Sequence, residues 1–223
     1  MSSFKLAEHF ISINGEGRCA GELALFLRFA GCNLRCDWCD TAWACGNDAP
    51  CELVSIGHLI QIAEDTVRQG VRNVTLTGGE PLLQENICEL IERLGRELGL
   101  RVEIETNGAV PLAEFKKHAG GGVYTMDYKL PSSKMERFMY TENFALLNEW
   151  DCVKFVCGSR ADVFRAKEIA EIYKPQCPLY LSPVFGRIDP AEIVNIMKEE
   201  KMGNFRLQLQ LHKFIWDPMA RGV

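Results

Sequence analysis

The sequence predicts an α/β fold: a partial, open TIM-type barrel of about six parallel strands joined by crossover helices. Two observations support this fold class. Short runs rich in β-branched residues alternate with longer amphipathic stretches, which is typical of a parallel sheet with helical connections. Only about six or seven such units are present, whereas a closed barrel of this type needs eight, so we expect the sheet to stay open.

The expected elements follow one another without a linker or an internal repeat. The expected strands are residues 23–30, 73–77, 101–106, 123–129, 151–156 and 178–182, with 205–212 as a candidate seventh. The expected helices are residues 55–70, 84–99, 160–174 and 190–203, each of which ends near Gly, Lys or Pro. We therefore expect one domain over residues 1–223.

Composition and charge exclude several classes of protein. Hydrophobic residues make up 47% of the chain and the net charge is −5, so a core can form but the basic surplus of a general nucleic-acid or anionic-membrane binder is missing. The longest apolar run is interrupted by Arg28 and is too short to span a bilayer. The first residues carry charges and lack the apolar core of a signal peptide. We expect a cytoplasmic protein with no nucleic-acid or membrane partner.

Three of the ten cysteines, Cys32, Cys36 and Cys39, are grouped as C-x3-C-x2-C. In a chain that is not exported, such a group indicates metal binding or catalysis rather than disulfides. A closed zinc site would need Cys45 or Cys51 as its fourth ligand. An iron–sulfur cluster held by only three thiolates would keep one iron open to another ligand. Both alternatives remain open on spacing alone.

The unusual stretches of the sequence fall at the ends of expected strands. GCNLRCDWC, GGEP, ETNG, DYKLPSS and LSPVFG follow five of them. Ligand sites of parallel sheets lie beyond the carboxyl ends of the strands, so we expect these stretches to gather on one face. Arg28 lies within the first apolar strand and needs a partner, either a core carboxylate or the carboxylate of a ligand.

The cysteine motif, with Trp38 just before its last cysteine, and GGEP (78–81) after the next strand resemble the radical S-adenosylmethionine (SAM) superfamily. The resemblance implies a radical SAM core in which Cys32, Cys36 and Cys39 hold a 4Fe–4S cluster and SAM chelates the fourth iron. Gly78 and Gly79 would let the backbone approach SAM closely, because glycine has no Cβ.

A narrower resemblance extends over nearly the whole chain. INGEG (13–17), FLRFAGCNLRCDWCDT (26–41), TLTGGEP (75–81), IETNG (104–108), KLPSS (129–133) and the terminal RGV are similar to the 7-carboxy-7-deazaguanine synthase family. The resemblance implies a lyase-type enzyme of queuosine and deazapurine biosynthesis. It would convert 6-carboxy-5,6,7,8-tetrahydropterin to 7-carboxy-7-deazaguanine by ring contraction with loss of ammonia, using a radical formed from SAM, and would require Mg2+.

The resemblance also implies roles for single residues. Thr41 would bind Mg2+, although without the resemblance a helix cap would be preferred. Asn14 stands where the family usually has Gln, and only Lys129 is retained of a segment often written S-P-K. The implied SAM-binding residues are Trp38, Cys39, Asp40, Gly78, Gly79, Glu105, Asn107, Asp127, Tyr128, Lys129 and Ser182. The implied substrate-binding residues are Ile13, Asn14, Gly15, Glu16, Arg28, Thr77 and Val223.

The implied partners are the pterin substrate, an electron donor such as flavodoxin or ferredoxin, and a second copy of the chain in a homodimer. Two alternative functions remain. A radical SAM activase of a glycyl-radical enzyme would bind a protein instead of a pterin, and the INGEG loop, Arg28 and RGV oppose it. A non-enzymatic iron–sulfur or zinc protein would need Cys45 or Cys51 as a ligand.

Overall fold

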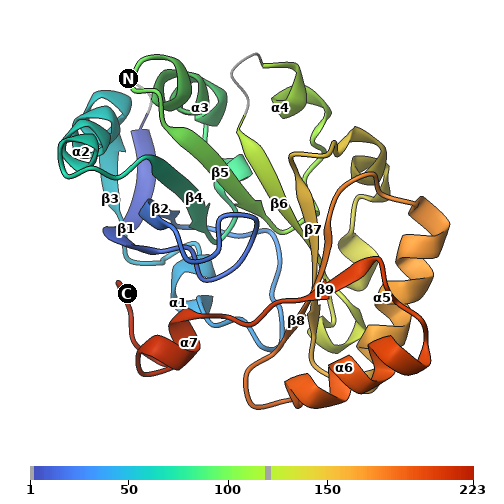
Figure 1. Cartoon of the computed structure of the whole chain (residues 1–223). Helices are drawn as coiled ribbons and strands as arrows, with labels where there is room; N and C mark the ends of the chain where they lie inside the picture. Colours follow the sequence, from blue (N-terminus) through green and yellow to red (C-terminus); the bar gives the residue numbers. More distant parts are fainter. Residues whose placement is uncertain (1–2, 119–121) are drawn as a thin grey trace.

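One nine-stranded sheet runs through the computed structural model, which describes residues 3–118 and 122–223. Its strands lie in the order β3-β1-β2-β4-β5-β6-β7-β8-β9 (Figure 1). The strands are β1 (Ser3–Ile13), β2 (Leu23–Phe29), β3 (Glu52–Ser55), β4 (Asn73–Gly78), β5 (Arg101–Thr106), β6 (Val123–Tyr128), β7 (Cys152–Cys157), β8 (Leu179–Pro183) and β9 (Phe205–Leu207). All of the six strands expected from the sequence are present.

The sheet is parallel from β2 through β9 and therefore contains seven parallel strands, counting the short β9. β1 runs antiparallel to both β2 and β3. The expectation of an open barrel is confirmed, because β3 and β9 lie at opposite ends of the strand order. The sequence did not reveal β1, because polar residues interrupt its apolar alternation in SFKLAEHFISI.

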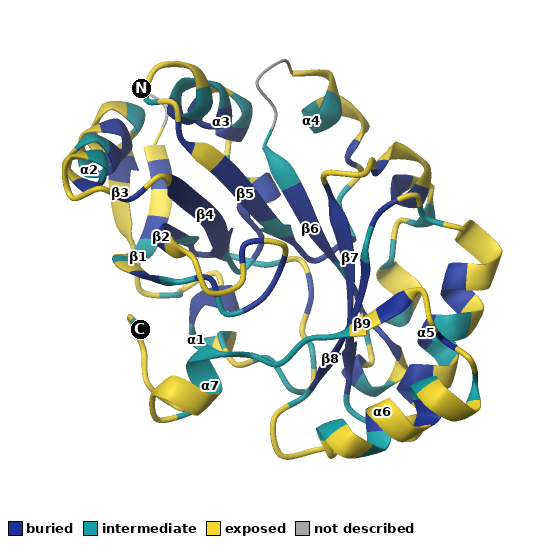
Figure 2. Ribbon diagram, in the orientation of Figure 1, coloured by how far each residue is buried: buried dark blue, intermediate teal, exposed yellow. Residues whose placement is uncertain are grey.

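The helices are α1 (Ala42–Cys45), α2 (Ile56–Arg68), α3 (Ile87–Arg96), α4 (Ala113–Lys117), α5 (Arg160–Tyr173), α6 (Pro190–Glu199) and α7 (His212–Ile215). The long helices α2, α3, α5 and α6 lie along the outside of the curved sheet, whereas the short α1 and α7 lie below the strands in this view (Figure 2). Side-chain caps fix three of the expected starts: Ser55 accepts from the N–H of His58, Ser159 from that of Asp162, and Asp189 from that of Ala191. Among the described residues, no helix is long and apolar enough to cross a membrane.

Three stretches differ from the expected elements. The connection from β6 to β7 contains three 3-10 helices, Pro131–Ser133, Glu136–Phe138 and Thr141–Leu146, in place of an α-helix. The expected strand over 205–212 ends at Leu207, and the chain then turns into α7. Another 3-10 helix, Pro81–Leu83, follows β4 directly, so α3 begins three residues later than the expected 84.

The two faces of the sheet have different chemistry. Leu76, Ile104 and Phe155 belong to the apolar core beneath the helices. The alternate positions on the same strands, which point to the inner face, carry Thr75, Thr77, Glu103, Glu105, Thr125, Asp127 and Lys154. Most of these inner side chains are buried although they are polar. A buried polar layer at the carboxyl half of parallel strands is the place where this architecture positions a site.

Candidate active site

The cysteine loop lies directly beyond the carboxyl end of β2. The N–H of Gly31 donates to the carbonyl of Ala44 at 2.8 Å, and that of Cys32 donates to the carbonyl of Cys45 at 3.1 Å. These bonds fasten the loop to α1, with Gly31 at a φ of 96° that favours glycine. Cys32, Cys36 and Cys39 are free thiols and only partly buried.

Hydrogen bonds around the cysteine sulfurs prepare two of them to act as thiolates. Cys32 Sγ lies 3.4 Å from the N–H of Leu34, and Cys39 Sγ lies 3.8 Å from Cys45 Sγ and 3.6 Å from Thr41 Oγ1. Hydrogen bonding from the Cys45 thiol, the largest cause, lowers the pKa of Cys32 and of Cys39 to about 6. Burial raises the pKa of Cys36 to about 11.

The donor set fits an iron–sulfur cluster. Soft thiolates are the ligands that such clusters take, and three of them lie on one loop that is still partly exposed. No group of three or more His, Cys, Asp or Glu side chains within 3–118 and 122–223 is placed to hold one metal ion. A cluster does not require such a group, because each thiolate binds a different iron.

Cys45 behaves as a hydrogen-bond donor in this arrangement. Its Sγ lies 3.4 Å from the carbonyl oxygen of Thr41, and the hydrogen bonds to Cys32 and Cys39 raise its own pKa far above the ordinary value. Cys51 is exposed. Because no group of three or more His, Cys, Asp or Glu side chains within residues 3–118 and 122–223 is placed around one ion, the described chain contains no preformed closed four-ligand site.

Gly78 and Gly79 serve a packing purpose that the sequence analysis did not anticipate. A Cβ on Gly78 would lie 2.1 Å from the carbonyl oxygen of Phe29, and one on Gly79 would lie 2.0 Å from that of Gly31. The N–H groups of Gly79 and Glu80 donate to these same two oxygens at 2.9 and 2.8 Å. The glycines thus let the end of β4 pack against the backbone of the cysteine loop, whatever they contribute to a ligand.

Glu80 is a site residue that sequence reasoning missed. Its carboxylate is fully buried and accepts hydrogen bonds from the N–H of Leu82 (3.1 Å), from Thr106 Oγ1 (3.0 Å) and from the N–H of Asn107 (2.7 Å). Burial raises the pKa of Glu80 to about 7 despite these bonds. Glu80 fixes the end of β4 to the end of β5, and the signal for it was a charge within GGEP.

Residues of ETNG face two directions. Asn107 Nδ2 donates to Asn33 Oδ1 at 2.7 Å and lies 3.6 Å from Cys32 Sγ, so Asn107 lies against the cysteine loop. Glu105 lies on the inner face, where it accepts a hydrogen bond of 2.7 Å from Thr77 Oγ1. The structure therefore brings Glu105 and Thr77 together.

The segment at the end of β6 is split between the two faces of the sheet. Asp127 is on the inner face, with Lys129 Nζ at 2.6 Å, and Lys129 lies 5.4 Å from the centre of the Trp38 ring. Tyr128 points the opposite way. Its ring packs against Phe144, and its hydroxyl donates to Glu136 at 3.2 Å. The Tyr128 side chain therefore lies on the face opposite Asp127, and its backbone is the part nearest the cysteine loop.

The loop after β1 carries the expected substrate residues and is tightly held. Asn14 Oδ1 accepts a hydrogen bond of 2.7 Å from Thr75 Oγ1, whereas its buried Nδ2 has no partner in the part of the chain that the structure describes. Glu16 accepts from Ser182, Lys154 and Gln210. Ser182, expected at SAM, is therefore bound to a residue of the expected substrate loop. Ile13 is the last residue of β1.

Arg28 has the partner that its position in an apolar strand required. Its Nε lies 2.7 Å from Glu8 Oε1 on the neighbouring β1, and the arginine side chain remains 16% exposed. The structure thus contains the salt bridge that was one of the two alternatives. Arg28 stands opposite Thr77, a residue of the inner face, in the register of β2 and β4 and is not fully buried, so it stays a candidate for binding a carboxylate.

The C-terminal segment passes beside the cysteine loop. Lys213 Nζ lies 3.4 Å from Asp40 Oδ2, and the Arg221 guanidinium lies 4.5 Å from the centre of the Trp43 ring. Val223, at the end of this segment, is of intermediate exposure. Thr41 occupies the N-cap position of α1, but its side chain makes no capping hydrogen bond, so its hydroxyl oxygen is not used for that purpose.

Several further residues complete the site without having been singled out in the sequence. Gln208 makes two hydrogen bonds of 2.8 Å with the backbone N–H and carbonyl of Gly17. His212 lies directly over Gly15, where a Cβ would be 2.2 Å from its Nδ1. Lys154 pairs with Glu16. A charge inside the apolar strand DCVKFVC was a usable signal, of the same kind as Arg28.

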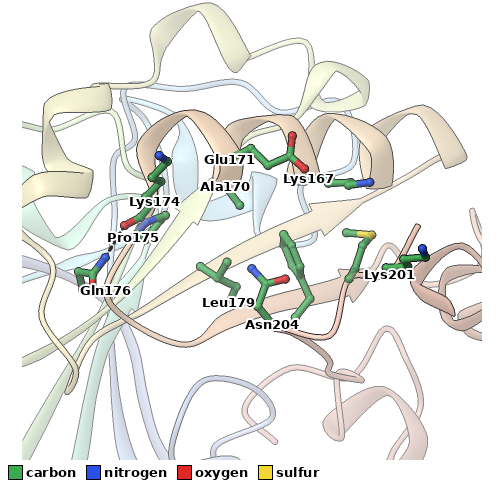
Figure 3. A pocket seen from close by; sticks show the side chains of 11 residues that line it. Lys167, Ala170, Glu171, Lys174, Pro175, Gln176, Leu179, Lys201 and Asn204 are labelled. Atoms are coloured by element: carbon green, nitrogen blue, oxygen red, sulfur yellow. Dashed lines mark hydrogen bonds between the residues drawn. The ribbon is translucent and has the colours of Figure 1, made fainter. Parts of the chain in front are cut away.

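Two surface cavities lie outside the cysteine loop. One of about 320 Å³ lies between α5 and the approach to β9 and is lined by residues such as Lys167, Glu171 and Asn204 (Figure 3). It contains none of the expected site residues. The other, of about 410 Å³, is lined by Phe185, Gln210 and Phe214 among others, and thus lies beside the glutamine that contacts Glu16.

Comparison with known proteins agrees with this geometry. The family model described as the radical SAM superfamily matches residues 27–199. A 7-carboxy-7-deazaguanine synthase from Clostridium acetobutylicum is 48% identical over 223 residues, covering 99% of this chain and 100% of that protein. One from Methanospirillum hungatei is 36% identical, covering 97% and 87%. The crystal structure of QueE from Escherichia coli superimposes with a TM-score of 0.67 at 20% identity, covering 93% of each chain.

The fold, the cysteine loop and the matching family model define a radical SAM protein, and this class implies a 4Fe–4S cluster and SAM. Within it, the near full-length identity to curated relatives is decisive. The chain belongs to the 7-carboxy-7-deazaguanine synthase family. It is accordingly a radical SAM enzyme of the lyase type.

Proposed function

We propose that this chain converts 6-carboxy-5,6,7,8-tetrahydropterin to 7-carboxy-7-deazaguanine, with ring contraction and loss of ammonia, in queuosine or deazapurine biosynthesis. The single observation that carries the proposal is the 48% identity over nearly the full length to a curated synthase. The C-x3-C-x2-C loop, packed against GGEP at the carboxyl ends of β2 and β4, supports it chemically.

We assign Cys32, Cys36 and Cys39 as the cluster ligands. When bound, the 4Fe–4S cluster and SAM supply an organic radical that abstracts hydrogen from the substrate. The protein orients these groups and excludes water. For SAM we propose contacts from the cysteine loop and the ends of the neighbouring strands, namely Trp38, Cys39, Asp40, Gly78, Gly79, Glu105, Asn107, Asp127, Lys129, Ser182 and the backbone of Tyr128.

The inner face supplies the proposed substrate contacts. Arg28 presents a planar fork of donors suited to the substrate carboxylate. Glu16 can accept from the N–H-rich edge of the pterin, and the unpartnered Nδ2 of Asn14 is a donor for one of its acceptors. The remaining proposed contacts are Ile13, Gly15, Thr77 and Val223.

We further propose that Thr41 binds Mg2+ through its hydroxyl. A hard oxygen donor suits this ion, and the other positions would be taken by substrate oxygens and waters. The absence of a side-chain cap on α1 supports this role, because the hydroxyl is not needed for the helix. In Thr41→Val, added Mg2+ should stimulate activity less than it does in the wild type, while the iron content should stay unchanged.

The experiment that tests the function is anaerobic reconstitution with iron and sulfide, followed by SAM, Mg2+, carboxytetrahydropterin and a chemical reductant. Deazaguanine product, measured by mass spectrometry, is expected from the wild-type chain. Single replacement of Cys32, Cys36 or Cys39 by Ala should abolish both iron binding and product. Cys45→Ala and Cys51→Ala should keep the iron. An intact cluster with no deazaguanine product would reject the specific reaction.

An acidic one-electron carrier such as flavodoxin or ferredoxin is the proposed electron donor. Several basic side chains lie at the cysteine loop, although the chain as a whole has a net charge of −5. Arg35 Nη1 lies 2.8 Å from the carbonyl oxygen of Cys32, and Lys134 and Arg187 flank Asp37 at 2.7 and 3.1 Å. Arg137 follows in the adjoining 3-10 helix. Such a surface suits a partner of opposite charge.

Charge reversal tests this electron donor directly. Lys134→Glu should slow reduction of the enzyme by flavodoxin several-fold. Added salt should narrow the difference in this rate between the variant and the wild type. Reduction by dithionite should be unchanged, because it needs no docking. Arg96→Glu on α3 is the matched control. If flavodoxin reduced Lys134→Glu and Arg96→Glu at equal rates, this surface would not be the docking site of the electron donor.

We also propose that residues 1–223 form one radical SAM domain that works in the cytoplasm as a homodimer, without nucleic-acid or membrane partners. A reducing compartment would keep the ten cysteines free. Exposed apolar side chains at Phe185, Phe214, Ile215 and Met219 offer surface for a second copy. Light scattering should give twice the chain mass of 25.1 kDa.

A further inference from the structure

A buried lysine on β7, Lys154, holds together the two halves of the site. Its side chain is only 7% exposed, and its Nζ lies 3.2 Å from Glu16 Oε2 and 3.2 Å from Asp127 Oδ1. Burial alone would lower the pKa of Lys154, but the charges of Asp127 and Glu16 outweigh it and raise the pKa well above its ordinary value. The lysine is therefore a cation shared by two carboxylates.

Fold stability does not explain this arrangement. Removing charges from water is costly, and apolar residues of similar volume often replace a buried ion pair with no loss of stability. The groups that surround the Lys154 ammonium are the carboxylates of Glu16 and Asp127 rather than apolar side chains. Lys154 is thus a candidate for a functional role.

The two carboxylates belong to different parts of the proposed site. Glu16 lies in the loop after β1 that we assign to the substrate, and it also accepts hydrogen bonds from Ser182 and Gln210. Asp127 lies at the end of β6, in the segment that we assign to SAM. Asp127 has a second cation, Lys129, at 2.6 Å. In residues 3–118 and 122–223, the cation paired with Glu16 is Lys154.

We propose that Lys154 is a positioning residue that couples SAM binding to substrate binding. This inference rests on the function proposed above. SAM contacts immobilise the end of β6 and, with it, Asp127. Lys154 then has a fixed anchor and holds Glu16 in one orientation, so less ordering remains when the substrate binds. SAM therefore raises the affinity for the substrate, and by thermodynamic linkage the substrate raises the affinity for SAM by the same factor.

The test is a binding measurement on the reconstituted enzyme without an electron donor, so that no turnover occurs. The dissociation constant of carboxytetrahydropterin is measured by calorimetry with and without saturating SAM. In the wild-type enzyme, SAM should lower this constant by about fivefold or more. In Lys154→Met the effect of SAM should fall below about twofold. Lys154→Arg keeps the positive charge and should therefore retain most of the effect of SAM on this dissociation constant.

A matched control is available elsewhere in the chain. Lys116 is also largely buried and ion-paired, with Asp151 at 2.5 Å, but it lies on α4 and contacts no residue of the proposed site. Lys116→Met should keep the full effect of SAM. Asp127→Asn removes the bridge from the other end and should lose the effect as Lys154→Met does. This second variant keeps the test decisive if Lys154→Met does not fold.

The outcomes separate the inference from the function on which it rests. If the wild type binds both ligands without coupling, or if Lys154→Met and Asp127→Asn keep the coupling, the role of Lys154 is rejected while the function stands. If the wild type does not bind carboxytetrahydropterin, or forms no deazaguanine on reduction, the proposed function fails and the inference fails with it.

Discussion

Two buried carboxyl groups, Glu103 on β5 and Glu80 just after β4, affect how the stability of the folded chain responds to pH. Burial raises the pKa of Glu80 and of Glu103 to about 7, above the 4.5 of an unperturbed glutamate. Each group binds a proton more readily in the folded state than in the unfolded state. Its contribution to stability is therefore complete below pH 4.5 and is lost as the pH rises through 7.

The variant Glu103→Gln should reveal the contribution of this carboxyl group to the pH dependence of stability. The amide can still accept the hydrogen bond of 2.6 Å from Thr125 Oγ1 but cannot ionise. Relative to wild type, the free energy of unfolding of Glu103→Gln should rise between pH 5 and pH 8, by about 3 kcal/mol at most. Urea unfolding at several pH values measures this. Parallel pH profiles of the two proteins would contradict the assignment.

Single-residue anomalies in the sequence were informative, but their partners were not. Arg28 inside an apolar strand required an opposite charge, and Glu8 provides it. Glu8 could not be named, because it lies on β1, a strand whose own pattern was obscured by polar residues. Lys154 gave the same kind of signal within DCVKFVC. Asp127 stands opposite Lys154 in the register of β6 and β7, whereas Glu16 comes from the loop after β1, which is distant in the strand order.

Strands and helix starts were predictable where local chemistry decides them. Several central strands, such as NVTLTG and RVEIET, alternate apolar residues of the core face with polar residues of the inner face, which is a local signal for a strand. Ser55, Ser159 and Asp189 cap helices as such residues commonly do. The segment 205–212 was not predictable by its alternation. Gln208 turns to bind the backbone of Gly17, 191 positions away, and ends the strand.

The contact between the end of β4 and the cysteine loop leaves no space for a side chain. Gly79→Ala would place a Cβ 2.0 Å from the carbonyl oxygen of Gly31. Because both groups are backbone, the loop must shift, and we expect a loss of about 1–3 kcal/mol of stability together with weaker iron retention. Thermal unfolding and iron analysis after gel filtration measure the two effects.

Gly203→Ala is the appropriate control, because nothing lies within 4 Å of a Cβ at that position. Gly203→Ala should leave both the stability and the iron content unchanged. If Gly79→Ala kept wild-type iron content and stability, the close approach of the two backbones would not matter for the site.

At the scale of the whole molecule, the C-terminal segment connects β9, at one end of the open sheet, with the loop after β1, the strand next to the other end. It leaves the sheet at β9 and returns to the loop after β1, where Leu211 N–H donates to the carbonyl of Gly15 at 3.1 Å. Gln208 adds the paired bonds to Gly17. This long-range closure could not be predicted from sequence, because it depends on which side of the sheet the chain crosses.

Gln208→Ala should loosen this closure. Loss of two hydrogen bonds, with the Gly17 backbone left unpaired, should cost about 1–3 kcal/mol locally. Amide hydrogen exchange at residues 14–17 should become faster, and KM for the pterin should rise more than kcat falls. The control Gln176→Ala replaces an exposed glutamine just after the end of α5. It should change neither the exchange at residues 14–17 nor KM. Unchanged exchange at 14–17 would show that other contacts hold the loop.

The open sheet has a consequence for solubility. A closed barrel has no free edges, whereas this sheet has two, and a long unpaired edge is a template on which further chains can add strands and aggregate. Both edges are short here. β3 has four residues and begins with a glutamate, and β9 has three residues. The two edge strands thus offer a neighbouring chain only four and three residues of backbone, and the main length of edge left for pairing is the part of β1 that continues past β3, from Glu8 to Ile13.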